Sequence, residues 1–180
     1  RSSFRGFDNC TELTKVVLPT SIKTISDSAL LGCTALEEIN IEQLNSLNTI
    51  EQGAFSGAFN GSGNLSLAIP ASLTGLGSYS FSSTGAGLKA ILFKGKKFSR
   101  NANTFNGSKI ERIIFQDSGT GTGSGFTNTS YAEGCFGNRP NLKTIVLPST
   151  FDVTRNNKIF KGSNSDVIVC LNRTKSNSTS

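Results

Sequence analysis

Phe136-Gly-Asn-Arg-Pro-Asn-Leu142-Lys-Thr-Ile145-Val-Leu147-Pro148 holds one aromatic residue, a turn of small and polar residues, and a Leu-x-x-Ile-x-Leu pattern closed by proline. Close or looser copies of this pattern run along the chain. Each copy follows a large apolar landmark residue, and the landmarks are Phe7, Leu30, Phe55, Phe81, Phe105, Phe136 and Phe160. Successive landmarks are 23, 25, 26, 24, 31 and 24 residues apart. A repeat of about 24 residues predicts a solenoid, because so small a unit can bury its apolar face only against its neighbours.

The spacing within one unit predicts its local structure. Alternation at Ile145 and Leu147 sends two side chains to the same face of a short strand, and Pro148 ends the strand because it has no N–H to donate. After the proline position come apolar residues three apart, which favour a tight or 3₁₀-like turn over the other side of the core. These pairs are Ile22 and Ile25, Leu47 and Ile50, and Leu73 and Leu76.

The unit resembles that of the BspA-like leucine-rich repeats, aFxgCxxLxxIxLPxsvxxIgxxaF, and the segment from Asn9 to Ile25 fits it nearly residue by residue. The resemblance covers residues 4 to about 170. It implies a right-handed leucine-rich-repeat coil with a parallel β-sheet of about seven short strands, turns or 3₁₀ segments on the convex side, and little regular α-helix. We expect one solenoid of about seven coils over residues 1–171 and a polar linker or tail over residues 172–180.

Two departures from the repeat predict protrusions. The connection Ser56–Asn64 is four residues too long and is expected to bulge outward. A Gly, Ser and Thr-rich insert near residues 117–134 buries too little apolar surface to order itself and is expected to be flexible. The chain begins at Arg1 and carries no run long enough to span a membrane, so we expect a fragment of a longer protein whose repeats continue before residue 1.

Composition argues against an enzyme. With no histidine in the chain, neither a Ser-His triad nor a His-ligated metal is available, and the 12 carboxylates are scattered. A parallel β-helix acting on acidic polysaccharides has coils of similar length, but no converging set of Asp or basic residues supports it. We therefore expect no catalytic residues, no metal and no cofactor.

The cysteines leave two readings open. Cys10 and Cys33 occupy equivalent places in neighbouring coils, where a disulfide and a ladder of small buried thiols are both possible, and we favour the thiols. Cys135 and Cys170 do not share that register.

Solvent-facing positions of the repeat should align into columns on the sheet. The column between the last two core residues reads Val17, Asn40, Ala68, Leu92, Ile114, Val146 and Ile168. Its neighbour is polar or small and reads Lys15, Glu38, Ser66, Ala90, Arg112 and Thr144. Large apolar residues about 4.8 Å apart would form a continuous stripe with a charged margin, which suits a protein partner. The alternative is that Val and Ile stand there only because they favour strands.

Together these features predict a non-enzymatic binding or adhesion module, extracellular or at the cell surface. The resemblance implies a host or partner protein as ligand, because members of that family are typically surface proteins of host-associated bacteria and some parasitic protists. The expected contact residues are Val17, Leu92, Ile114, Val146 and Ile168, with Lys15 and Arg112 beside them.

The net charge of +6 supports a second candidate, the binding of anionic (sulfated) glycans by a basic cluster. The members of this cluster are Lys94, Lys96, Lys97, Arg100 and Lys109. No nucleic-acid motif accompanies these charges, so nucleic acid is not an expected partner, and neither is membrane insertion.

Overall fold

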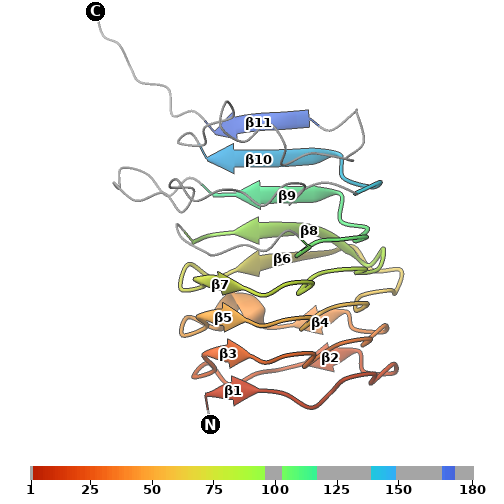
Figure 1. The fold of residues 1–180 in the computed structure, drawn as a ribbon, viewed down its shortest axis with the longest axis vertical. Coiled ribbons are helices and arrows are strands. Elements are labelled where there is room, and N and C mark those ends of the chain that lie inside the picture. The colour runs from red at the N-terminus through yellow and green to blue at the C-terminus, as the bar shows by residue number, and fades with distance from the viewer. Residues whose placement is uncertain (1, 96–102, 117–138, 149–167, 173–180) are drawn as a thin grey trace, which may run out of the picture.

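The structure is a computed structural model that describes residues 2–95, 103–116, 139–148 and 168–172. These residues stack as successive coils from the N-terminal to the C-terminal end of an elongated molecule (Figure 1). The elements are β1 (Ser3–Phe4), β2 (Lys15–Val16), β3 (Thr24–Ile25), β4 (Glu38–Ile39), the 3₁₀ helix η1 (Ile41–Gln43), β5 (Thr49–Ile50), β6 (Leu65–Ile69), β7 (Gly75–Leu76), β8 (Leu88–Phe93), β9 (Arg112–Phe115), β10 (Thr144–Pro148) and β11 (Ile168–Asn172). Within the described ranges no helix is long and apolar enough to cross a membrane.

Parallel strands form the front face, as the repeat predicts. The strands of the Leu-x-x-Ile-x-Leu segments are β2, β4, β6, β8, β9, β10 and β11, and every observed pairing between them is parallel. They do not form one sheet. The pair β2–β4 makes one ladder and the order β6-β8-β9-β10-β11 makes another, with no pairing between β4 and β6. The predicted solenoid of the leucine-rich-repeat type is confirmed, with its front sheet divided in two.

The back face carries a second parallel sheet of short strands, in the order β1-β3-β5-β7. The expected tight turns precede these strands, since the amides of Ile22, Leu47 and Leu73 each donate to a carbonyl three residues earlier. The next apolar residue of each pair then lies in a strand, so that Ile25 pairs with Ile50 and Ile50 with Leu76. Only the second coil, which lacks the proline, has a 3₁₀ helix in the described residues.

A column of large side chains fills the core between the two faces. Leu30, Phe55, Phe81 and Phe105 are buried, and the rings of Phe55 and Phe81 stack with centroids 5.1 Å apart. The Phe81 and Phe105 centroids are 5.9 Å apart. At the first coil Phe7 remains 41% exposed and stacks on Phe4 instead. The landmarks Phe136 and Phe160 lie outside the described residues.

The connection Ser56–Asn64 does not simply bulge outward, as the sequence had suggested. Ala58 and Phe59 are fully buried, and the Phe59 ring stacks on Phe55 at 5.7 Å. Backbone bonds tie the segment to the coils on both sides, since the Asn60 amide donates to Thr34 and the Ala58 carbonyl accepts from Gly85. The extra residues turn inward because burial of a second phenylalanine removes a large apolar surface from water.

Candidate functional site

A column of apolar side chains crosses the middle of the five-stranded ladder. Ala68 pairs with Leu92, Leu92 with Ile114, and Ile114 with Val146, so the four lie side by side on β6, β8, β9 and β10. All four are half-buried, whereas the flanking inward residues of the same strands are buried. We call Ala68, Leu92, Ile114 and Val146 the apolar stripe. Each member is therefore partly covered and still partly accessible to solvent.

A polar margin accompanies the stripe in the predicted register. Ser66 pairs with Ala90, Ala90 with Arg112, and Arg112 with Thr144. Arg112 is exposed, so its charge stands beside Ile114 on the same strand.

Glu111 joins three neighbouring coils next to this margin. Its carboxylate accepts from Lys89 Nζ at 3.1 Å and from Lys143 Nζ at 2.8 Å. These hydrogen bonds, that of Lys143 first, hold the pKa of the Glu111 carboxyl below its ordinary value. Both lysines are therefore engaged within the solenoid, and Arg112 is the more available cation on this face.

The structure corrects the place of Ile168. Ile168 pairs with Thr144, in the polar column, and Cys170 is the residue opposite Val146. The register is shifted by two residues because Val167, Val169 and Leu171 are all apolar, so the alternation alone fits two registers. The observed one pairs Val169 and Leu171 with the buried Ile145 and Leu147. Ile168 is 61% exposed but does not extend the apolar stripe.

Val17 is also separated from the stripe. It is 69% exposed at the end of β2, and its neighbour in the predicted column is Asn40. The Asn40 side chain accepts from the Leu18 amide at 2.8 Å and donates to the Leu18 carbonyl at 2.9 Å. Asn40 thus replaces a strand partner with side-chain bonds and interrupts the apolar column. Lys15, in the polar column, is ion-paired with Glu38 at 2.6 Å.

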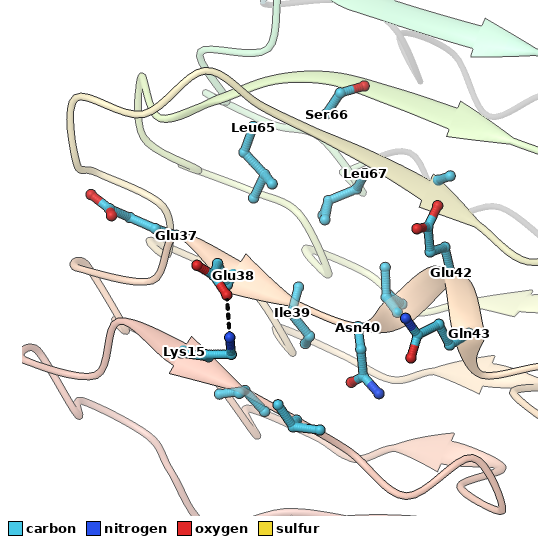
Figure 2. A pocket seen from close by; sticks show the side chains of 14 residues that line it. Lys15, Glu37, Glu38, Ile39, Asn40, Glu42, Gln43, Leu65, Ser66 and Leu67 are labelled. Atoms are coloured by element: carbon cyan, nitrogen blue, oxygen red, sulfur yellow. Dashed lines mark ion pairs between the residues drawn. The ribbon is translucent and has the colours of Figure 1, made fainter.

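A groove of about 430 Å³ lies between the two ladders, at the missing pairing of β4 and β6. Figure 2 shows Ile39 on the β4 side, Leu65 and Leu67 on the β6 side, and Glu38 and Glu42 along the rim. We call this the β4/β6 groove. Sequence reasoning missed it, although two signals stood next to each other: the second coil lacks its proline, and the connection that follows is too long.

The basic cluster is only partly visible. Lys94 is half-buried and Lys109 is exposed, while Lys96, Lys97 and Arg100 lie outside the described residues. The described residues therefore include only two of the five members of the basic cluster.

Cys10 and Cys33 are free thiols in this structure. Cys33 is buried, its Sγ donates to the Phe7 carbonyl at 3.0 Å, and burial raises the pKa of its thiol. The side chains of Cys135 and Cys170 are outside the described part of the chain. Among the residues that the structure describes, no three His, Cys, Asp or Glu side chains are grouped to hold a metal ion.

Several solved structures resemble the chain. The pneumococcal vaccine antigen PcpA aligns over 94% of this chain and 34% of its own, with 20% identity and a TM-score of 0.45. A leucine-rich cell surface protein from Faecalibacterium prausnitzii aligns over 94% and 62%, with 16% identity and a TM-score of 0.45. A leucine-rich repeat protein from Bacteroides ovatus aligns over 94% and 58%, with 20% identity and a TM-score of 0.34. The chain thus spans between about one third and three fifths of these proteins.

No curated protein matches the sequence significantly. The profile of the BspA type leucine-rich repeat region matches in six copies, over residues 3–132 and 56–166. These matches cover most of the chain, and they fall on the stacked units whose strands and core column are described above. The chain belongs to the BspA-type leucine-rich repeat family.

Proposed function

We propose that the chain is a non-enzymatic module that binds a partner protein on the front face of its five-stranded ladder, outside the cell or at its surface. The observation that carries this proposal is the apolar stripe. Four apolar side chains follow one another in direct register, with no polar residue among them. Single exposed apolar residues are common on any protein, whereas an uninterrupted row of them favours a contact surface.

The chemistry around the stripe fits a protein ligand. Interfaces between proteins combine a dry apolar centre with a polar rim that includes arginine. Leu92, Ile114 and Val146 supply the centre, and Arg112 stands at the rim. The strands behind these residues are paired on both sides, so the surface is rigid and little conformational entropy is lost when a partner binds.

Family membership supports the proposed placement outside the cell, because BspA-like proteins are typically surface proteins of host-associated organisms. A host extracellular protein is accordingly the partner class that we propose. The alternative ligand class is a sulfated glycan bound by the basic cluster. Its binding would be driven by charge and would weaken as the salt concentration rises, whereas apolar docking would hardly change.

The test is capture of extracellular matrix proteins and sulfated glycans by the purified chain, at low and at physiological salt. Apolar docking on the stripe should persist at physiological salt. The paired change Ile114→Ser and Val146→Ser should weaken it on the order of tenfold or more, because these residues stand at the centre of the proposed contact.

Val17→Ser is the matched control, since Val17 is exposed but lies outside the stripe. It should leave binding unchanged. Equal binding by the wild type and the stripe variant would overturn the proposal and leave strand propensity as the reason for these residues. Capture of sulfated glycans alone, lost at physiological salt, would move the function to the basic cluster.

A further inference from the structure

The β4/β6 groove is bordered by strand edges. Successive residues of a strand direct their backbone groups to opposite neighbours. In β6, the Leu65 amide donates to Gly87 and the Ile69 carbonyl accepts from Lys94, so the odd-numbered residues face β8. Ser66 and Ala68 therefore turn their backbone N–H and C=O toward β4. β4 and β6 are not paired, so these groups border the groove without a strand partner, although η1 contacts β6 and lines the groove as well.

The opposite border has the complementary geometry. The Glu38 amide donates to the Thr14 carbonyl on the β2 side, so the next residue, Ile39, directs its backbone toward β6. Two open parallel edges thus face each other across one groove. Edges of this kind are templates for an additional strand.

The groove also opens toward the core. In β2, β6, β8, β9 and β10 the first inward residue is buried; these residues are Val16, Leu67, Ile91, Ile113 and Ile145. Ile39 holds the same position in β4 and is only half-buried, as is Leu65 across the groove. Ile39 and Leu65 pack against the core cluster and line the groove at the same time. They form an apolar floor that could receive an aliphatic side chain.

The rim is acidic although the chain as a whole is basic. Glu37, Glu38 and Glu42 line the groove together with a single cation, Lys15. Lys15 is ion-paired with Glu38, whereas neither Glu37 nor Glu42 has an ion pair among the described residues. The groove therefore favours a cationic occupant, against a net charge of +6 for the whole chain.

We propose that the β4/β6 groove binds an extended segment of a partner protein in which lysine or arginine alternates with aliphatic residues. The segment adds a strand between β4 and β6, and its backbone bonds to Ile39 on one side and to Ser66 and Ala68 on the other. Its aliphatic side chains rest on Ile39 and Leu65. Its basic side chains, on the opposite face of the added strand, lie along Glu38 and Glu42.

The groove and the apolar stripe meet at one residue, Ala68, which lines the groove, whereas Leu92, Ile114 and Val146 do not. The proposal therefore does not depend on the side chains at the centre of the stripe. The probe is a fluorescently labelled peptide, Lys-Val-Lys-Val-Lys, whose anisotropy is measured against the purified chain at low salt. Binding is expected, and Val146→Ser should leave it unchanged while it weakens binding at the stripe. A wild-type chain that does not bind the peptide would overturn the proposal.

Charge substitutions at the rim test the orientation of the peptide. Glu42→Gln should weaken binding about two- to fivefold, and Glu12→Gln, which removes an exposed carboxylate outside the groove, should not. At the exposed Ser66, Ser66→Lys should weaken binding and Ser66→Glu should strengthen it. Equal effects of Glu42→Gln and Glu12→Gln, or of the two Ser66 variants, would contradict the proposal.

The backbone contribution is tested on the peptide itself, so that no variant of the chain has to refold. The same peptide with both valines N-methylated cannot donate from those positions and should bind about tenfold more weakly. Unchanged binding would exclude an added strand. The alternative occupant of the groove is a second copy of the chain, and sedimentation of the chain alone tests for it. A dimer that the peptide disrupts would show that a second copy fills the groove. This result would overturn the proposal for a partner protein.

Discussion

The two ladders of the front face differ in the length of their strands. β2 and β4 are two residues each, whereas β6, β8, β9, β10 and β11 have four to six. The inward residues are of the same kind in both, Val, Ile or Leu followed by Leu, Ile or Phe. The solvent-facing position between them is Val17 and Asn40 in the short ladder and Ala68, Leu92, Ile114 and Val146 in the long one, so a polar residue stands there only in the short ladder among these six.

A side chain that bonds to the backbone competes with the ladder. Asn40 occupies both backbone groups of Leu18, and β2 and β4 end at Val16 and Ile39. Leu92 and Ile114 cannot compete in this way, and the pairing of β8 with β9 continues to Phe93 and Phe115. The core residues are similar in the two ladders, and the bonds of the Asn40 side chain to Leu18 lie where the short strands end.

A substitution in the core column behind the two ladders should have the largest effect on stability. Phe81→Ala deletes a fully buried ring that stacks between Phe55 and Phe105. The free energy of unfolding should fall by about 3–5 kcal/mol, as measured by urea denaturation. The counterpart Phe7→Ala removes a ring that is 41% exposed and should cost about 1 kcal/mol. Similar losses for the two variants would refute the shared core column.

The next change tests the packing of the connection Ser56–Asn64, which leads into the first strand of the long ladder. A Cβ on Gly85 would stand 2.5 Å from the Phe59 carbonyl oxygen and closer still to Asn60 Cα, both in backbone that cannot turn aside. Gly85→Ala should therefore destabilise the chain by about 2–4 kcal/mol in the same assay. Gly63→Ala adds a methyl group 3.9 Å from its nearest neighbour and should change stability by less than about 1 kcal/mol. If both variants unfold alike, the inward packing of the connection is wrong.

A smaller effect is expected at Asn40, where the ladders are distinguished. Asn40→Ala removes two bonds to the backbone of Leu18 and should lower the free energy of unfolding by about 1–2 kcal/mol. Asn40→Ile should recover part of this loss, because it restores the kind of residue found in the long ladder. Asn45→Ala, at an exposed position, is the control. An Asn40→Ala variant as stable as this control would remove the side chain as the cause of the short strands.

The smallest effect is a dependence on pH in the long ladder. The folded-state pKa of Glu111 lies below its ordinary value of 4.5, so its contribution to stability is complete above that value and is lost as the pH falls below it. Wild-type stability should therefore decrease on acidification slightly more than that of Glu111→Gln. Denaturation at neutral pH and below pH 4.5 measures the difference. Parallel profiles for the two proteins would show that Lys89 and Lys143 do not stabilise the fold through Glu111.

Much of the fold could be predicted because the spacing of apolar residues in the repeat indicates which side chains are buried. The spacing of landmarks located the core column, and alternation located the front strands and the register that joins Ala68 to Val146. Three features escaped. The apolar run around Ile168 fits two registers, and the burial of Phe59 depends on space between coils. The sheet divides between β4 and β6, where the second coil has η1 in place of the proline and a long connection follows. Each of these is decided by contacts between units, which the pattern of a single unit does not contain.

The most direct test of the divided front face is hydrogen exchange of individual backbone amides. The amides of Ile39, Ser66 and Ala68, which face the open groove, should exchange rapidly in the folded protein. Those of Leu92 and Ile114, in the middle of the five-stranded ladder, should be protected nearly to the level of global unfolding. Slow exchange at Ser66 and Ala68, matching that of Leu92, would show one continuous sheet and would contradict both the division and the groove that follows from it.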